Sequence, residues 1–272
     1  MTTLRLRPLS APAVALGGLF ALALAGGAQD ALDGEAIVRR ADRDHRSKDE
    51  RGVVEMVLVA EGSPPQRREM EVLSKTGSGE DDMNMMRFLS PPNVRGTAVL
   101  TVEATGRADD QWVYLPALRK SKRIATGQRK ERFSGTDFTY EDLRTEDFSR
   151  TSYKLDGEAQ VQTEKDGPQI ACHVVEATPK DADASGYSKR RLFVDKARFL
   201  ILKVEYFDKQ GRHQKTWTGR DFTQVDGLWR PSQSMMEDHL RNTKTVMRFT
   251  ERKINPGLPD ATFTEAALER GL

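Results

Sequence analysis

Short β-prone segments recur along most of this sequence, and turn signals separate them. Hairpin-type signals include Asp166-Gly167, residues 208–211 (DKQG) and Asp226-Gly227. Long helices do not alternate with these segments, so a parallel sheet is disfavoured. The pattern predicts a mainly β protein built on a large, strongly curled antiparallel sheet. The strands are expected within 52–61, 67–75, 83–90, 97–102, 110–116, 152–156, 159–165, 169–179, 188–195, 197–208, 212–222, 228–238 and 244–252.

A single early helix is expected over residues 33–48. Asp33 can cap its amino end, Glu35 lies in its first turn, and Ile37 and Ala41 belong to a narrow apolar stripe. Such a helix cannot cover the apolar face of ten or more strands that are each about 17–20 Å long. The sheet must therefore close on itself or leave its inner face for a ligand.

Alternation along the strands groups apolar side chains on one side of the sheet. In 54–58, the side chains of Val54, Met56 and Leu58 share a side, and the same is expected of the alternate residues in 200–206. These side chains either pack on one another as a core or line an apolar cavity. The candidates for the cavity wall are Val54, Met56, Leu58, Met86, Phe88, Trp112, Tyr114, Phe133, Phe138, Tyr140, Leu200, Leu202, Val204 and Tyr206.

The least strand-like stretch is the basic segment 116–135, which an acidic segment over 137–147 follows. One interpretation is a basic rim that meets phosphate head groups or an acidic partner. The other is a solvated loop whose charges pair with the acidic segment. Phe133, Phe138 and Tyr140 lie at this boundary and can close over a cavity mouth like a lid. The rim candidates are Arg119, Lys120, Lys122, Arg123, Arg129, Lys130 and Arg132.

Residues 1–28 have a basic start, a short apolar run and small residues near the end, which is typical of a cleavable secretory signal peptide. The alternative is a membrane anchor that stays attached. Cleavage after Ala25 or Ala28 would leave 29–272 as one exported domain, most simply in a bacterial periplasm. Removal of Arg5 and Arg7 would leave 41 basic and 41 acidic side chains, and this balance argues against a nucleic-acid binder.

The sequence contains none of the common catalytic or metal-binding motifs. HExxH, GxSxG, GxGxxG and GxxxxGK[ST] patterns are missing, and the only cysteine, Cys172, excludes an intramolecular disulfide. Cys172 and His173 are adjacent in a strand, so they point to opposite faces and are poorly placed as a nucleophile and base. Cys172 is expected to be a small buried apolar residue. No cofactor or metal is predicted, and a hydrolase remains the less favoured alternative.

Several longer motifs resemble the periplasmic outer-membrane lipoprotein-sorting family related to LolA and LolB. The resemblance lies in MMRFLSPPNVRGTAVL (85–100), DDQWVYLPALRKSKRI (109–124) and FSGTDFTYEDL (133–143), and 172–180 and 187–216 fit the same pattern. It implies a half-open antiparallel β-barrel with a helical lid over an apolar cavity. The sequence is closer to an uncharacterised LolA-like branch than to the classical carrier.

The resemblance also implies a function that involves no chemistry. It implies carriage of an acylated lipoprotein or lipid across the periplasm toward the outer membrane, with transient membrane contact at most. An inner-membrane exporter and an outer-membrane acceptor would be the partners. The alternative within the same superfamily is a lipid-sensing regulatory module or an accessory subunit of an exporter.

Overall fold

The computed structural model describes residues 33–271 except 78–80 and 105–108. The predicted signal peptide, residues 1–28, lies outside the described residues. The first described element is α1 (Gly34–His45), where the Asp33 side chain caps the helix by accepting a hydrogen bond from the Ala36 N–H at 2.7 Å. This confirms the predicted early helix and its cap.

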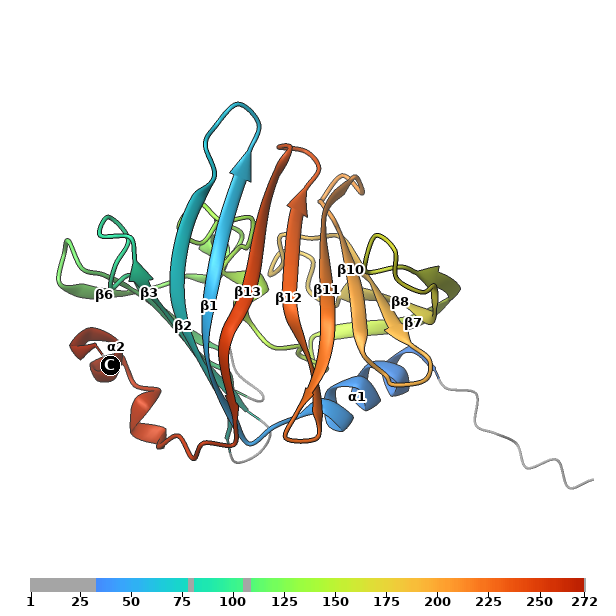
Figure 1. The fold of residues 1–272 in the computed structure, drawn as a ribbon, viewed down its shortest axis with the longest axis horizontal. Coiled ribbons are helices and arrows are strands. Elements are labelled where there is room, and N and C mark those ends of the chain that lie inside the picture. Colours follow the sequence, from blue (N-terminus) through green and yellow to red (C-terminus); the bar gives the residue numbers. More distant parts are fainter. Residues whose placement is uncertain (1–32, 78–80, 105–108, 272) are drawn as a thin grey trace, which may run out of the picture. The chain divides into compact units, whose positions relative to one another are not determined.

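Thirteen antiparallel strands form one curled sheet (Figure 1). Their order is β6-β5-β4-β3-β2-β1-β13-β12-β11-β10-β9-β8-β7, so the chain winds out from the centre to one edge and back from the other. The edge strands β6 and β7 do not pair with each other, so the barrel is half-open. The strands are β1 (Asp49–Ala60), β2 (Gln66–Thr76), β3 (Asp82–Ser90), β4 (Ala98–Val102), β5 (Asp110–Leu115), β6 (Lys120–Arg123), β7 (Thr151–Val161), β8 (Ile170–Pro179), β9 (Lys189–Asp195), β10 (Ile201–Phe207), β11 (His213–Val225), β12 (Leu228–Asp238) and β13 (Thr243–Ile254).

Two strand predictions need correction. The sequence predicts separate strands over 152–156 and 159–165, but β7 covers the first and continues to Val161 with an irregular register between Leu155 and Gly157, and 162–165 belong to the connection to β8. The short edge strand β6 lies in the basic segment that looked least strand-like. The hairpin signal at Asp226-Gly227 is confirmed, because both residues have positive φ and join β11 to β12 in a two-residue turn. Asp166-Gly167 lies instead within the longer connection 162–169 between β7 and β8.

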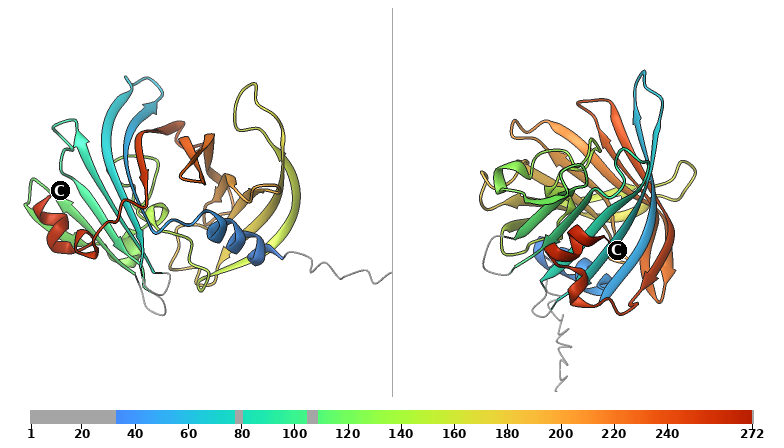
Figure 2. Two further views of the ribbon diagram at one scale, coloured as in Figure 1. Left: turned by 60° about the horizontal axis from the view of Figure 1, so that its bottom comes forward. Right: turned by 90° about the vertical axis from the view of Figure 1, so that its left-hand side faces the viewer.

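The two faces of the sheet carry different coverings (Figure 2). On the concave side, α1 buries Ile37, Val38 and Ala41 against β8 and β9. On the convex side, the short C-terminal helix α2 (Glu265–Arg270) buries Leu268 among residues of β2 to β4. Neighbouring strand residues separate accordingly, since Met86 packs on the concave side and Met85 on the convex side.

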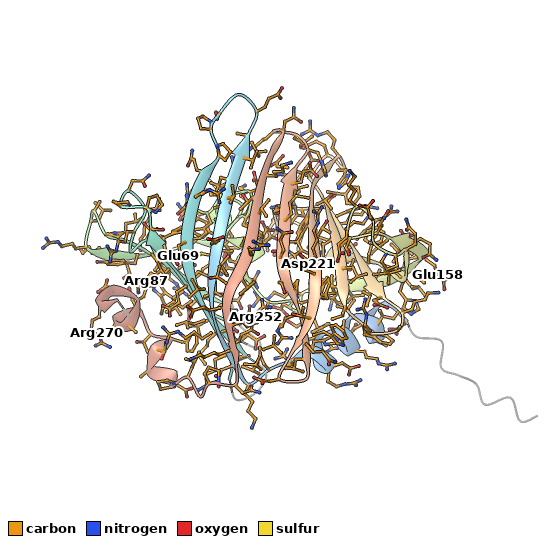
Figure 3. The ribbon with its side chains drawn as sticks, viewed as in Figure 1. Glu69, Arg87, Glu158, Asp221, Arg252 and Arg270 are labelled. Atoms are coloured by element: carbon orange, nitrogen blue, oxygen red, sulfur yellow. The ribbon has the colours of Figure 1, made fainter. Side chains whose placement is uncertain are left out.

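Arg87 fixes α2 to the convex face of β3 (Figure 3). Its guanidinium donates to the Leu268 carbonyl at 2.7 Å, and Arg87 is only 7% exposed. Burial lowers the pKa of this guanidinium. A cationic donor at the last turn satisfies a helix carbonyl that has no partner within the helix.

A bulge in β10 divides a group of residues that the sequence placed together. Leu200, Leu202, Val204 and Tyr206 were expected to share one side of the sheet. The register with β9 shifts between Ile201 and Lys203, which turns the strand over. Val204 and Tyr206 therefore face the concave side, whereas Leu200 and Leu202 pack on the opposite face with Cys172.

Candidate functional site

Residues 124–150 connect β6 to β7 across the concave side of the sheet, and we call this segment the inner loop (Figure 2). It contains two short 3-10 turns, η1 (Thr126–Gln128) and η2 (Glu141–Leu143). Its central part folds back on itself, with the Phe133 N–H donating to the Phe138 carbonyl at 2.8 Å and the Tyr140 N–H to the Glu131 carbonyl at 3.1 Å. The loop thus satisfies many of its own backbone groups.

The inner loop places aromatic side chains between the two halves of the curled sheet. The Phe133 ring stacks on Phe88 of β3, with centroids 5.2 Å apart, and lies 5.8 Å from the Tyr140 ring. Phe138 packs in the apolar cluster that includes α1, and Leu143 contacts the clusters on both halves. The inner loop therefore fills the space that an open half-barrel would leave.

Polar side chains tie the inner loop to the sheet. Asp137 accepts hydrogen bonds from the hydroxyls of Thr243 and Thr245 on β13, at 2.5 and 2.7 Å. Asp142 forms a buried ion pair with Lys215 of β11, and each side chain is 1% exposed. Among the described residues, no backbone-to-backbone hydrogen bond joins 131–143 to a strand of the sheet. The attachment to the sheet runs through side chains.

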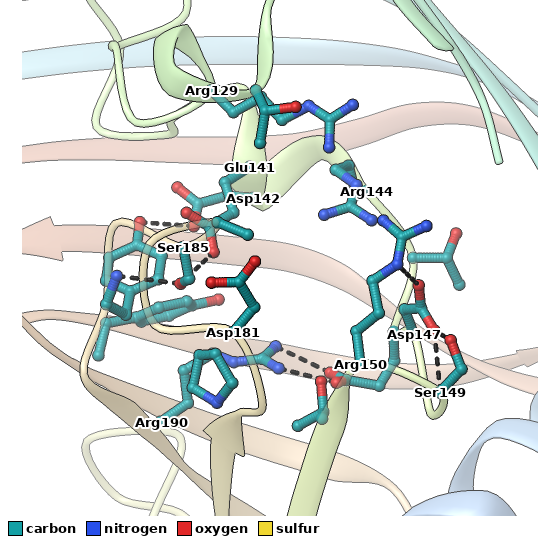
Figure 4. A pocket seen from close by; sticks show the side chains of 18 residues that line it. Arg129, Glu141, Asp142, Arg144, Asp147, Ser149, Arg150, Asp181, Ser185 and Arg190 are labelled. Atoms are coloured by element: carbon teal, nitrogen blue, oxygen red, sulfur yellow. Dashed lines mark hydrogen bonds and ion pairs between the residues drawn. The ribbon is translucent and has the colours of Figure 1, made fainter. Parts of the chain in front are cut away.

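A cavity of about 600 Å³ lies beside the inner loop (Figure 4). Its walls come from the inner loop, the start of β7, the β8–β9 connection and β10. Charged and hydroxyl groups dominate the lining, and its apolar part comes from Pro179, Ala184 and the rings of Tyr187 and Tyr206. The lining residues are Thr126, Arg129, Glu141, Asp142, Arg144, Thr145, Glu146, Asp147, Ser149, Arg150, Thr151, Pro179, Asp181, Ala184, Ser185, Tyr187, Arg190 and Tyr206.

A half-buried ion pair between Arg190 and Glu146 forms part of the cavity wall. The Arg190 guanidinium binds Glu146 through two hydrogen bonds of 2.7 and 2.8 Å, and the Tyr153 hydroxyl donates to the same carboxylate. Burial opposes ionisation of Glu146, but the charge and hydrogen bonds of Arg190 outweigh it and lower the pKa of the carboxyl. The bidentate geometry fixes both side chains.

The predicted apolar wall residues are distributed over packed clusters on both faces. Concave-side packing includes Met56, Leu58, Met86, Phe88, Phe133, Phe138, Tyr140, Val204 and Tyr206, and Val54 of β1 is also buried. Trp112 and Tyr114 lie on the convex side beside α2, and Leu200 and Leu202 lie opposite Val204. Only Tyr206 among these candidates lines the polar cavity. This cavity is therefore not the apolar cavity that the sequence predicts. The inner loop fills the concave side of the sheet, where that apolar cavity was expected.

The basic rim candidates have different environments. Arg119, Lys120, Lys122, Arg123 and Lys130 are exposed, and Arg123 pairs with Asp110. Arg129 is buried and lines the cavity, where its guanidinium donates to the Asp109 carbonyl at 2.8 Å. Arg132 pairs with Asp137 at 2.8 Å, which fits pairing within the loop. Arg144, Arg150 and Arg190 also line the cavity but lie outside the basic segment 116–135.

Cys172 and His173 lie on opposite faces of β8, as their neighbouring positions in a strand predict. Cys172 is fully buried on the convex side, and burial raises its thiol pKa to about 11. His173 lies on the other face, with its ring 6.3 Å from that of Phe199. Within 33–77, 81–104 and 109–271, no three His, Cys, Asp or Glu side chains gather as metal ligands would. No helix in these ranges has the length and apolar character to cross a membrane.

Comparisons with known proteins match this architecture. A family model described as "Uncharacterized protein" matches residues 80–270. A domain from Vibrio parahaemolyticus, classed as an outer membrane lipoprotein-sorting protein, is 30% identical, with a TM-score of 0.80 over 87% of this chain and 98% of that one. A DUF1329 family protein from Desulfovibrio piger is 29% identical, with a TM-score of 0.79 over 86% and 97%.

A more distant structure shows the same fold. A LolA superfamily protein from Nitrosomonas europaea is 22% identical, with a TM-score of 0.69 over 87% of this chain and 100% of that one. No protein of curated function matches the chain. Together with the half-open sheet and its helical covering, these matches show that the chain belongs to the LolA-like outer membrane lipoprotein-sorting family, in its uncharacterised branch.

Proposed function

We propose that this protein is a periplasmic carrier that shelters the acyl chains of a lipoprotein or lipid on the concave side of its sheet and moves them toward the outer membrane. The observation that carries the proposal is the covering of the concave side. A self-contained loop, rather than strands or a long helix, fills the centre of the half-barrel with Phe133, Phe138 and Leu143. The lipoprotein-sorting relative and the predicted signal peptide support the compartment.

The proposed mechanism is an exchange of one apolar filling for another. An acyl chain gains roughly 0.8 kcal/mol for each buried CH2, so a chain of about 16 carbons has on the order of 10 kcal/mol available. The central part of the inner loop, 131–143, can move as a unit because its backbone hydrogen bonds stay within the loop, and side chains such as Asp137 and Asp142 attach it to the sheet. The chain would then occupy the surface that Phe133, Phe138 and Leu143 leave.

The same exchange of the inner loop for the acyl chain also favours release of the cargo. When cargo departs, the aromatic side chains return to the apolar clusters, so the empty carrier does not expose its concave surface to water. Competition between the loop and the acyl chain keeps the net affinity below the full transfer free energy. A carrier between two membranes needs this balance, whereas an enzyme would need reactive groups aimed at a bond.

Recovery of bound lipid tests the proposal. The exported protein should be purified from the periplasm without detergent and analysed by native mass spectrometry, with displacement of a fluorescent fatty acid measured on the same preparation. The proposal predicts a co-purified acylated species and saturable displacement. A preparation that carries no acylated species and binds no fluorescent fatty acid would contradict it.

A further inference from the structure

Two exposed histidines lie side by side where β11 begins and just after β12 ends, at one end of the sheet (Figure 1). The rings of His213 and His239 have centroids 4.5 Å apart. The Nε2 atom of His213 lies 2.9 Å from the Thr216 hydroxyl oxygen, and the Nε2 atom of His239 lies 2.8 Å from the same oxygen. The two imidazole nitrogens therefore converge on one point at the protein surface.

This histidine pair lies on the convex face of the sheet. Lys215 pairs with Asp142 of the inner loop, so its side chain faces the concave side. The next residue, Thr216, faces the convex side, because side chains alternate along β11. Both histidines contact the Thr216 hydroxyl and so belong to the same face. The pair is separate from the polar cavity and from the proposed acyl site.

Contacts with neighbouring strands hold the two rings in place. The His239 N–H donates to the Gln214 carbonyl at 2.8 Å, which ties the end of β12 to β11. The Phe207 ring of β10 stacks on the His213 ring, with centroids 5.4 Å apart. Side chains that are already held side by side lose less conformational freedom when they bind a common ligand.

The Thr216 hydroxyl connects the rings but leaves them available to a stronger ligand. The hydroxyl has one proton, so it donates to one of the two nitrogens and accepts a hydrogen bond from the other. A metal ion between the rings would instead be bound by a lone pair from each Nε2 atom. A zinc–nitrogen bond of about 2.0–2.1 Å is shorter than these hydrogen bonds, and both rings are exposed and free to rotate toward the ion.

The charges around the histidine pair balance one another. Glu205 of β10 and Glu237 of β12 are the register partners of Thr216 on its two sides. Glu205 pairs with Lys203 at 2.8 Å, and Glu237 lies opposite Lys244 in the register of β12 and β13. The nitrogen donors therefore decide the choice of ion. Imidazole suits Zn²⁺ and Cu²⁺, whereas Ca²⁺ and Mg²⁺ require oxygen ligands.

We propose that His213 and His239 bind one divalent transition metal ion, of the Zn²⁺ or Cu²⁺ class, through their Nε2 atoms. The ion takes the place of the Thr216 hydroxyl between the two rings. Zn²⁺ takes four ligands, so two positions are left to water or to an external ligand. The bound ion joins the start of β11 to the end of β12 and stabilises the folded state. This site is independent of the carrier proposal.

Isothermal titration calorimetry of the untagged, exported protein with Zn²⁺ tests the site. We expect saturable binding of one ion per chain, which His213→Gln and His239→Gln each weaken at least tenfold. His173→Gln is the matched control, since it removes a histidine that lies elsewhere, on β8, and it should leave the affinity unchanged. Both variants at the site replace exposed side chains and should fold, which urea unfolding without metal verifies.

Two further measurements identify the ligands. Saturating Zn²⁺ should raise the melting temperature of the wild type and of His173→Gln but not of His213→Gln. Electron paramagnetic resonance with Cu²⁺ should show coupling to two imidazole nitrogens in the wild type and to one in either variant at the site. Absence of saturable Zn²⁺ binding, affinity that neither variant weakens, or one ion shared by two chains would overturn the proposal.

Discussion

The concave and convex sides of the sheet both contain apolar clusters, but different kinds of structure cover them. On the convex side, Leu268 of α2 packs among strand residues, and Arg87 holds the helix through its carbonyls. On the concave side, the inner loop inserts aromatic rings and is attached through buried polar side chains such as Asp137 and Lys215. The convex covering resembles an ordinary core, whereas the concave covering is the part that we propose gives way to a bound acyl chain.

The largest expected effect is the loss of stability when one buried side chain is truncated on each side of the sheet. Phe133→Ala and Leu268→Ala should destabilise the protein by about 3–5 and about 2–5 kcal/mol, because each leaves a cavity in a packed cluster. Denaturant unfolding measures both losses. Only Phe133→Ala should also tighten the binding of a fluorescent fatty acid, because it empties part of the proposed acyl site. Equal effects of both variants on fatty-acid affinity would contradict the proposal that only the concave side binds the acyl chain.

The buried ion pair that holds the inner loop gives the next largest effect. Lys215→Met should cost about 3 kcal/mol, because it leaves the Asp142 carboxylate buried without its cationic partner. The matched control is Arg212→Met, whose guanidinium is 63% exposed beside Asp208 and should cost less than about 1 kcal/mol. Urea unfolding of both variants checks the order. A similar loss for the two would show that burial does not strengthen the concave attachment.

A smaller effect concerns the pH dependence of the link between β4 and the inner loop. Glu103 accepts a hydrogen bond from the Thr145 N–H at 2.6 Å, and burial, together with the nearby Asp82 and Asp109, raises the pKa of Glu103 to about 7 against the opposing effect of Arg144. The folded state therefore holds this proton more tightly than the unfolded state. The resulting stability is fully present below about pH 4.5 and is lost as the pH rises through about 7.

Replacement of Glu103 by Gln isolates this contribution. The variant should gain roughly 1–2 kcal/mol relative to the wild type between pH 5 and pH 8, after allowance for partial exposure of the carboxyl. Thermal unfolding at the two pH values measures the difference. If Glu103→Gln and the wild type respond to pH in parallel, Glu103 does not titrate in this range.

The smallest effect is expected at the exposed part of the basic rim. Lys122→Gln should change the free energy of unfolding by less than about 0.5 kcal/mol, since the side chain is exposed on the edge strand β6. Fatty-acid binding should also stay the same. A clear loss of either quantity would mean that the rim contributes more than solubility, and would favour the basic-rim interpretation over a solvated loop.

The sequence was informative about the fold where local patterns decide the structure. Turn chemistry at Asp226-Gly227 and the cap at Asp33 predicted the β11–β12 hairpin and α1. Alternation placed Cys172 and His173 on opposite faces. The bulge in β10 could not be predicted, because one extra residue between Ile201 and Lys203 leaves no mark in an apolar run.

The candidate site was harder to predict because distant segments form it. Arg190 of β9 meets Glu146 of the inner loop, and Lys215 of β11 meets Asp142, across gaps in sequence that no local pattern reports. The charged run over 137–150 was visible, but its pairing depends on the curl of the sheet. Trp112 and Tyr114 illustrate the same limit, since alternation groups them without showing which face is concave.

The most direct test of the account is the distance between the inner loop and the sheet, with and without a bound acyl chain. Spin labels at Lys130→Cys and Lys244→Cys, in a Cys172→Ala background, report the distance between the inner loop and β13, and labels at Arg270→Cys and Lys122→Cys report the distance between α2 and β6. A saturating long-chain fatty acid should lengthen the first distance in a pulsed electron paramagnetic resonance measurement and leave the second unchanged. Stoichiometric binding of the fatty acid with no change in the first distance would contradict the account.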